Sequence, residues 1–570
     1  MLLALLAPFA MLACSGGSSS PEGATTGPQD TLVIAAQSDA KDMLYVVSQA
    51  ASDSHIIGAT NWAAVDSDFD CKIKYKPQIA KEWTFSEDGK TLSLTLRDDL
   101  KWPDGTPVTA KDYKRTFDLV ANPAVASPRM EHTRRMVEDA RPKVIDDQHV
   151  EFHFTQAYDR DTMLAHASLP FVPAHLLETA DVGSLRAHPL NATAPAANGP
   201  WRVATWEKNA RLVLEPNPTF SGPESHKPKL RRVIFKVLPE YATRLVELEN
   251  GSVDVMEAVL VSDADKIAKA HPDIRLHRRG WRSMDYVAWN AIDPADYKAA
   301  ASKTPDTEKV DVTTVKPHPI FGDRDVRRAL ANAIDVDKLI KDLLTSEATG
   351  EVYGRPSIGT LTPALCGVHN DNVQRVPYDP TVARARLAEL GWTDSNGDGV
   401  LDKNGVPMRF SLMTNGGNAR RAKAAIIVQA NLKAIGVDAE IETIESNTFF
   451  ERLRKRDYEA ALSGWSAGLF VDPSAIWGEG SEFNFTSYRN PEVQALIEQG
   501  LSEPDAEKAK PIWMDLQAKI YDDQPYAFLY WMDEIVAVHS RFENTTVDVL
   551  SPYRNLEQWS VPADKVKYKQ

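Results

Sequence analysis

The chain has 570 residues, of which 43% are hydrophobic and 25% are charged, the composition of a folded globular protein with room for two or more domains. Its 65 basic and 80 acidic residues give a formal net charge of -15, and a field of that sign repels a phosphate backbone. No dense basic tract with interleaved aromatic residues offsets this charge, so we expect no nucleic-acid partner.

The N-terminus predicts export. Residues 2–12 are almost wholly apolar, too short a run to span a bilayer comfortably, and they lead to Ala13 and Cys14 as an export signal does. Small residues before Cys14 indicate a bacterial lipoprotein cleavage site, so we expect residues 1–14 to be a signal peptide and Cys14 to carry the lipid. Residues 15–30, rich in Gly, Ser and Pro, predict a flexible tether. A plain secreted or a cytosolic protein is the alternative.

The first part of the folded chain predicts a strand and then a hairpin with a helix. Residues 31–36 are a short apolar run that suits a strand buried on both faces. Within residues 82–117, leucines 92, 94 and 96 alternate with polar residues, which predicts a half-buried strand following a turn at residues 87–89. Thr109 lies three residues before Asp112, the spacing of a capping box that begins a helix.

The remaining elements alternate in type. From residue 281 onward, helical periods of apolar residues alternate with short strands, which predicts a mostly parallel sheet covered by helices. The insert at residues 291–317, rich in Lys, Asp and Thr, predicts a surface loop. Strands are expected at 150–154, 201–206, 211–214, 233–238, 286–290, 437–441 and 459–465, and helices at 241–248, 326–334, 380–390, 420–435 and 449–456.

Four separated motifs resemble one family. They are EWTFSEDGKTLSLTLRDDLKWPDGTPVTAKDYKRTF at residues 82–117, NGPW with the turn NPTF after residue 198, FGDRDVRRALANAID at 321–335, and YDP with LGW between 378 and 392. In this order they resemble the extracellular solute-binding proteins that deliver oligopeptides, dipeptides or nickel to ABC importers. The resemblance spans roughly residues 31–560, which chance matches to short motifs do not produce.

The resemblance implies an α/β, two-lobe periplasmic-binding-protein fold, with mixed sheets flanked by helices and an extra domain inserted in lobe one. We expect residues 31–60, 191–280 and 535–570 to form lobe one, residues 61–190 the inserted domain and residues 281–534 lobe two. The chain then crosses the hinge twice, and a ligand that touches both lobes stabilises the closed form.

The same resemblance places the ligand near residues 465–472. In peptide-binding relatives an Asp shortly after this Trp neutralises the ligand's α-amine, whereas here Gly468 stands at that position and Asp472 comes later. Either the amine anchor has moved to Asp472 or the ligand lacks a free amine. The expected ligand-binding residues are Trp465, Ser466, Ala467, Gly468, Asp472, Trp289, Asn290 and Trp477, although any of these tryptophans can instead be a core residue.

Three further motifs have competing interpretations. Residues 464–468 fit G-x-S-x-G, which with His539 and Asp472, Asp522 or Asp523 would make Ser466 the nucleophile of a hydrolase, but Pro473 interrupts the helix that this motif requires. Residues 394–402 space oxygen ligands as a calcium loop does, but Gly405 replaces the final Glu, so a metal-free turn is favoured. Arg129, His132, Arg134 and Arg135 form either a solvated helix face or a surface for a ligand carboxylate.

Cysteine usage leaves one question open. Apart from Cys14 the chain has only Cys71 and Cys366, which are far apart in sequence. An exported protein permits one disulfide between them, and two buried free thiols are the alternative. Neither has the spacing of a zinc site.

We therefore expect a lipid-anchored, monomeric receptor on the periplasmic side of the envelope that captures a peptide or peptide-like solute and delivers it to an ABC permease. It needs no cofactor and no metal and is not an enzyme. The alternatives are a receptor for a nickel chelate, an opine or an oligosaccharide and, from a different class, a serine hydrolase that uses Ser466.

Overall fold

The structure is a computed structural model that describes residues 30–193, 195–304 and 310–568. The expected signal peptide, Cys14 and nearly all of the expected tether lie outside these residues. Asp30, the last residue of that tether, is buried, and its carboxylate accepts hydrogen bonds from the backbone N–H groups of Thr31 at 2.6 Å and Lys567 at 2.8 Å. Within the described ranges, no helix has both the length and the apolar character that crossing a membrane requires.

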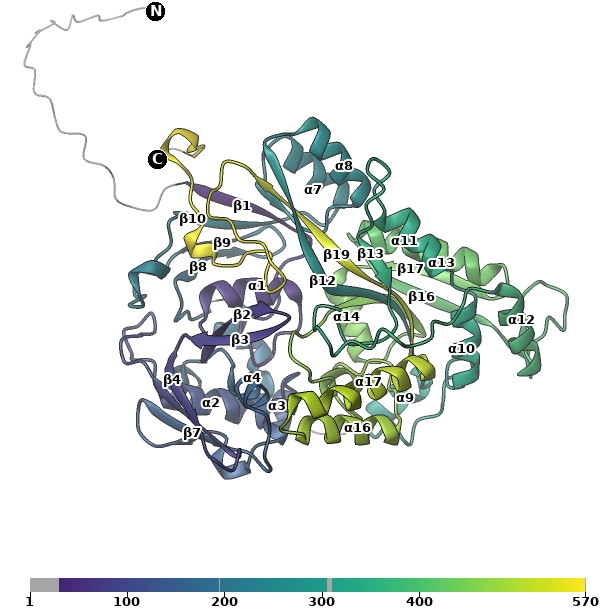
Figure 1. Cartoon of the computed structure of the whole chain (residues 1–570), viewed down its shortest axis with the longest axis horizontal. Helices are drawn as coiled ribbons and strands as arrows, with labels where there is room; N and C mark the ends of the chain where they lie inside the picture. The colour runs from purple at the N-terminus through teal and green to yellow at the C-terminus, as the bar shows by residue number, and fades with distance from the viewer. Residues whose placement is uncertain (1–29, 194, 305–309, 569–570) are drawn as a thin grey trace, which may run out of the picture.

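Among the described residues, eleven strands form one mixed sheet that runs through both lobes (Figure 1). Its order is β17-β16-β18-β12-β19-β11-β1-β10-β9-β8, and β13 pairs with β19 beside this path. The strands are β1 (Thr31–Ala36), β8 (Trp201–Glu207), β9 (Arg211–Pro216), β10 (Arg232–Val237), β11 (Val255–Met256), β12 (Ile274–Trp289), β13 (Gly354–Pro356), β16 (Arg409–Asn415), β17 (Asp438–Ile444), β18 (Ala460–Ser466) and β19 (Tyr526–His539).

Each lobe contributes one end of this sheet. In lobe one, the buried strand β1 pairs in parallel with β10 and β11, and β9 and β8 extend the edge in antiparallel fashion. In lobe two, β16 pairs in parallel with β17 and β18, but β12 and β19 are antiparallel, so the sheet is mixed and not mostly parallel. The α/β fold with mixed sheets and flanking helices is confirmed.

Helices cover the sheet in both lobes. Lobe one has α1 (Ala51–Thr60), α7 (Tyr241–Glu249) and α8 (Val261–Ala270). The lobe-two helices are α10 (Arg324–Asn332), α11 (Val336–Leu344), α12 (Pro380–Glu389), α13 (Ala419–Lys433), α14 (Ser446–Arg454), α15 (Ser474–Trp477), α16 (Pro491–Ser502) and α17 (Ala506–Asp523). The insert at residues 291–317 is not wholly loop, because Asp293 caps a helix there, α9 (Pro294–Ala301), by accepting from the Asp296 N–H at 2.8 Å.

The long strands β12 and β19 join the two lobes. Residues 274–279 of β12 pair with β19 beside the strands of lobe one, and residues 283–288 pair with it beside β18. The ladder shifts register at two places, between Arg279 and Ser283 and between Asp285 and Tyr286. At the first, Trp281 has a φ of 47° and its N–H donates to Asp533 Oδ1 at 2.9 Å. A bulge with a positive φ at a bulky residue is a local irregularity at the point where the lobes meet.

The inserted domain has its own sheet and helices. Strands β4 (Ala80–Phe85), β5 (Thr91–Leu96), β7 (His149–His153) and β6 (Lys143–Val144) pair in that order. The predicted hairpin and capping box are confirmed, since Thr109 caps α2 (Ala110–Ala121) and its N–H donates to the Asp112 carboxylate at 2.8 Å. The other elements are the hairpin of β2 (Val65–Asp70) and β3 (Lys72–Pro77), and the helices α3 (Glu131–Arg134), α4 (Arg160–Ala167), α5 (Ala174–Leu177) and α6 (Pro189–Ala192).

A buried cluster of charged side chains joins strand β12 to helix α13 and strand β19 in lobe two, close to the bulge. Asp285 on β12 is fully buried, and its carboxylate accepts from Arg420 Nε at 2.9 Å, from Arg421 Nε at 3.0 Å and from the Tyr530 hydroxyl at 3.1 Å. Burial alone would raise the pKa of Asp285, but the two guanidinium groups hold it below its ordinary value. A Cβ at Gly464 would lie 2.5 Å from Asp285 Oδ1, so only glycine leaves room for this cluster.

We predict that Asp285→Asn lowers the free energy of unfolding by about 3–5 kcal/mol, because removing one partner leaves buried guanidinium groups uncompensated. Urea unfolding followed by circular dichroism measures this. Asp438→Asn is the matched control, since Asp438 pairs with Arg409 at the surface and its loss should change stability little. Equal effects of the two changes would contradict the structural role of the cluster.

Candidate functional site

The segment from Trp465 to Asp472 leaves the sheet at the boundary between the lobes. β18 ends at Ser466, which pairs with Ser283 next to the bulge of β12 and is exposed. Ala467 continues the contact, because its N–H donates to the Arg282 carbonyl at 2.8 Å and its carbonyl accepts from Arg282 Nε at 3.0 Å. The segment is thus held by the strand that joins the two lobes.

Trp465 lies at the edge of a cluster of aromatic residues. Its half-buried indole stacks on Phe485 with ring centroids 5.6 Å apart, and its Nε1 donates to the Tyr526 hydroxyl at 3.1 Å. Tyr526 stacks in turn on Tyr286 at 3.8 Å. Contacts with Phe485, Phe483 and Tyr286 leave the indole half-buried, so it gives the edge of this cluster a rigid apolar surface that can contact a ligand.

Asp472 is paired across the boundary with the inserted domain. Its buried carboxylate lies 3.6 Å from Arg135 Nη1 and 3.3 Å from His166 Nε2. The N–H of Ser474 also donates to Asp472 Oδ1, at 2.9 Å. His132 packs edge-on against His166 at 5.0 Å, so two imidazoles, a guanidinium and a carboxylate meet here.

The protonation states follow from burial and from these partners. Burial would raise the pKa of Asp472, but Arg135 and His166 hold it below its ordinary value, so the carboxylate is charged. Burial lowers the pKa of His166 well below its ordinary value and lowers that of His132 to about 4. At neutral pH the cluster therefore contains one anion, one cation and two neutral imidazoles.

The cluster adjoins a groove between the lobes. This groove has a volume of about 240 Å³ and receives side chains from the inserted domain, among them Arg135 and Tyr158, and from lobe two, among them Ser474 and Glu498. In the described structure, Arg135 Nε and both ring nitrogens of His166 are buried without a hydrogen-bond partner.

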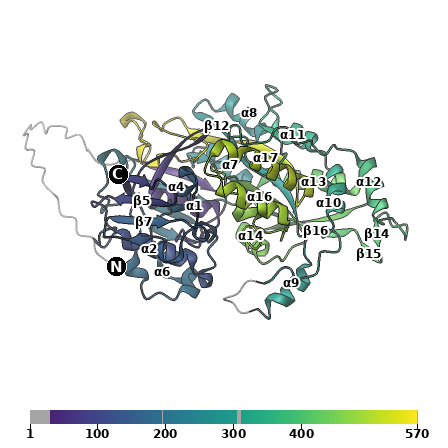
Figure 2. The same ribbon diagram turned by 60° about the horizontal axis from the view of Figure 1, so that its bottom comes forward.

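Figure 2 shows the purple and blue elements of lobe one and the inserted domain beside the green elements of lobe two, and further side-chain contacts cross this boundary. Gln49, just before α1, donates to the Glu482 carboxylate at 3.2 Å and accepts from Arg454 at 3.4 Å. Arg129 places its guanidinium 3.8 Å from the ring centroid of Tyr45 and donates to the Ser48 carbonyl, which ties the segment before α1 to the inserted domain. The contacts of Gln49 therefore join lobe one to lobe two.

The structure does not bring all the expected site residues together. Trp289 is fully buried in lobe two, where it stacks on Phe321 at 4.8 Å, and Asn290 is buried and donates to the Tyr458 carbonyl at 2.9 Å. Trp477 is also buried, with its Nε1 donating to Thr360 Oγ1 at 2.6 Å, and it packs behind Tyr526. These three residues lie in the interior of lobe two, so we leave them out of the proposed contact surface.

The basic residues predicted at positions 129–135 lie in two different environments. Arg134 is exposed, as a solvated helix face requires, whereas Arg135 is 6% exposed and faces Asp472. His166, Tyr45 and Arg282 complete the boundary but had no distinguishing local pattern in the sequence. His166 lies in a run of apolar residues on α4, the pattern of an ordinary core position.

The hydrolase geometry is absent from the described residues. Ser466 pairs with Ser283, while His539 pairs with Ile274 at the other end of β12, nine residues away. At about 3.3 Å per strand residue, the two side chains are separated by about 30 Å. Asp472 faces Arg135, and Asp523 accepts from the Tyr488 hydroxyl at 2.5 Å, so neither aspartate orients His539.

The loop at residues 394–402 uses its carboxylates to hold a turn. The two oxygens of Asp394 accept from the N–H groups of Gly397 at 2.8 Å and Gly399 at 3.0 Å, and Asp402 accepts from the Ser395 N–H at 2.8 Å. Across the described residues, no group of three or more His, Cys, Asp or Glu side chains is arranged to hold a metal ion.

Comparison with known families decides the class. Residues 74–486 match the model of the bacterial extracellular solute-binding proteins, family 5, which is most of the chain. The chain belongs to this family. It is thus a solute-binding protein of the class that serves peptide and nickel ABC importers and not an enzyme, and members of the family are extracellular or periplasmic.

Individual relatives cover nearly the whole chain. The oligopeptide-binding protein AppA of Bacillus subtilis is 26% identical over 98% of both chains, and the nickel-binding periplasmic protein of Escherichia coli is 24% identical over 93% of both. Among solved structures, AppA from Bacillus subtilis in complex with a nonapeptide superposes with a TM-score of 0.82 at 23% identity, covering 94% of this chain and all of that one. This similarity confirms the two-lobe fold.

We predict that Arg135→Gln and Asp472→Asn each lower the free energy of unfolding by about 3 kcal/mol, because each leaves a buried charge without its partner. The double variant should lose about 1–2 kcal/mol less of its free energy of unfolding than the two single losses added together, since the two residues interact directly. Urea unfolding of all four proteins gives this coupling. The exposed pair Asp70 and Lys74, 2.9 Å apart, is the control and should show almost no coupling.

We also predict that acid destabilises the protein through the boundary histidines. An unfolded histidine binds a proton below about pH 6.5, whereas folded His132 does so only near pH 4, so stability is unaffected above 6.5 and falls between the two values. His166, which faces Arg135 and Asp472, acts in the same direction. Urea midpoints measured from pH 7 to pH 4 should fall less steeply in His166→Gln, and equal slopes would contradict this account.

Proposed function

We propose that this protein captures a peptide or peptide-like solute between its lobes and delivers it unchanged to an ABC permease in the membrane. The observation that carries the proposal is that residues 465–472 of lobe two lie against the inserted domain of lobe one, so one ligand at this place touches both lobes. A ligand that binds the closed form more tightly than the open form shifts the equilibrium toward the closed form, by as much as the two affinities differ. Relatives that are named as oligopeptide-binding support a peptide as the solute.

In this proposal the half-buried indole of Trp465 contacts the ligand, and the exposed residues Ser466 and Gly468 offer polar groups beside it. Ala467 lies between them, with its N–H and carbonyl held by Arg282. Asp472 already has a cationic partner in Arg135. A ligand ammonium group at Asp472 would have to compete with that guanidinium in a buried place, so we favour a ligand that does not depend on a free amine there. Water fills the remaining space, as it does in many polar sites.

We further propose that export and a lipid on Cys14 hold the protein at the periplasmic side of the cell envelope as a monomer. A disulfide between Cys71 and Cys366 supports export, because disulfides persist in oxidising compartments. A metal chelate is the second candidate solute. The nickel-binding relative is nearly as similar to this chain as the oligopeptide-binding one, which is the observation in its favour.

Native mass spectrometry of the purified protein tests the choice of solute. We expect a bound species whose mass and fragmentation are those of a peptide. A metal complex or a sugar as the sole bound species would contradict the peptide proposal.

Trp465→Ala should weaken binding of the co-purified solute about tenfold or more in calorimetric titration, because large aromatic contacts dominate such surfaces. Trp83→Ala is the matched control, since Trp83 lies on β4 of the inserted domain, in a surface groove away from the lobe boundary. Unchanged affinity in Trp465→Ala, or an equal loss in both variants, would remove Trp465 from the site.

A further inference from the structure

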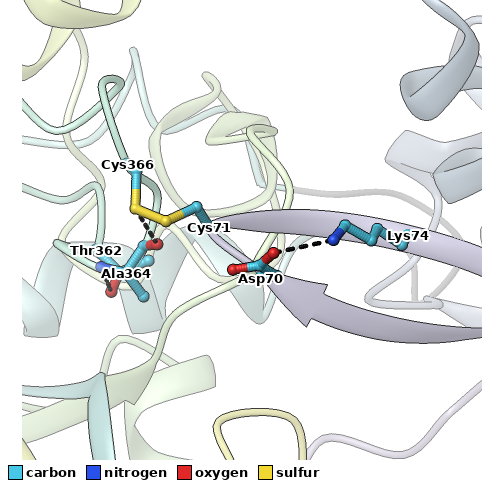
Figure 3. Close-up of a disulfide and its surroundings, with 6 residues drawn as sticks. All are labelled: Asp70, Cys71, Lys74, Thr362, Ala364 and Cys366. Atoms are coloured by element: carbon cyan, nitrogen blue, oxygen red, sulfur yellow. Dashed lines mark hydrogen bonds and ion pairs between the residues drawn. A yellow bond between two sulfur atoms is a disulfide. The ribbon is translucent and has the colours of Figure 1, made fainter.

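A disulfide connects the two halves of the molecule (Figure 3). Cys71 stands at the tip of the β2–β3 hairpin of the inserted domain, and Cys366 stands in the loop that follows β13 in lobe two. The two residues are 295 positions apart in sequence, and both are exposed to solvent, so the alternative of two buried free thiols is wrong.

Hydrogen bonds hold the β2–β3 hairpin to lobe one and to the rest of the inserted domain. Arg554, in the C-terminal segment of lobe one, donates to both carboxylate oxygens of Asp66 at 3.0 and 3.2 Å. The Tyr75 hydroxyl donates to the Asp161 carbonyl at 3.3 Å, and the N–H of Ala80 donates to the Ala64 carbonyl at 2.8 Å. The tip therefore moves with lobe one.

The loop that carries Cys366 is fastened to lobe two. At its start, the Ser357 N–H donates to the Leu529 carbonyl on β19 at 3.1 Å. Further along, Gln517 on α17 donates to the Asn370 carbonyl at 2.9 Å, and Asn370 donates to the Met514 carbonyl at 3.1 Å. Cys366 therefore moves with lobe two.

This connection restricts how far the lobes can separate. The Cα atoms of Cys71 and Cys366 are 5.0 Å apart, and an intact disulfide allows at most about 6.8 Å. The other contacts described across the boundary are hydrogen bonds, ion pairs and packing, all of which can break and reform.

We propose that the Cys71–Cys366 disulfide is a redox-controlled latch that restricts opening of the lobes, and that its reduction by a dithiol permits wide opening. A thiolate of the reductant attacks one exposed sulfur, and the resulting mixed disulfide is resolved by the second thiol. Two electrons and two protons pass to the protein, which gains two thiols, while the reductant becomes a disulfide. Both sulfurs are accessible for this exchange.

The role in solute exchange rests on the proposed function, but the latch itself is testable without any ligand. Hydrogen–deuterium exchange of the oxidised protein and of the protein reduced with dithiothreitol measures opening directly. We expect the boundary peptides, residues 44–50 and 464–474, to exchange at least about tenfold faster after reduction, because opening exposes them. Residues 409–444, inside lobe two, should not change.

Variants separate the latch from other effects of reduction. Cys71→Ser and Cys366→Ser should each exchange like reduced wild type and should not respond to dithiothreitol. Asp70→Ser is the matched control, because it changes the exposed residue next to Cys71 and leaves the disulfide intact, so it should behave like oxidised wild type.

Three results would overturn the latch: alkylation of both Cys71 and Cys366 in protein purified without reductant, equal boundary exchange with and without dithiothreitol, or a uniform rise that includes residues 409–444. The last would mean that the disulfide stabilises the whole fold without restricting the lobes. If reduction opens the lobes but native mass spectrometry finds a metal complex or a sugar as the sole bound species, the latch stands and the peptide proposal fails.

Discussion

The rest of the structure depends on the antiparallel ladder of β12 and β19. Its two ends carry different neighbours, so one pair of strands belongs to both lobes and fixes their relative position. This ladder shifts register between Arg279 and Ser283, at the lobe boundary, and again between Asp285 and Tyr286, inside lobe two. Pairing on both sides of the first bulge keeps the lobes in register, and a bulged ladder resists bending less than a regular one does.

The boundary combines two kinds of contact with different physical limits. The Asp472 cluster is held by charge in a buried setting, so it is strong when both partners are present and costly when one is missing. The disulfide is covalent and does not depend on pH or salt, but it responds to thiols. A closed form held by the first remains reversible, whereas the second limits movement until it is reduced.

Local sequence patterns predicted most of the elements. The alternating leucines of β5 and the capping box at Thr109 depend on near neighbours, and the structure has them as predicted. The length of β12 was underestimated, because residues 274–285 mix charged and apolar side chains without a period of two. The helix α9 within the insert was missed for a similar reason, since none of its residues is buried and its sequence therefore has no helical period of apolar residues.

The sequence by itself determined the family and the two-lobe architecture, because each rests on local patterns in a fixed order. Only the tertiary structure decided that Cys71 bonds to Cys366, that Asp472 pairs with Arg135 and His166, and that Trp289 belongs to the core. These contacts join residues that are distant in the chain. Their formation depends on how whole lobes pack, and no spacing along the sequence encodes that.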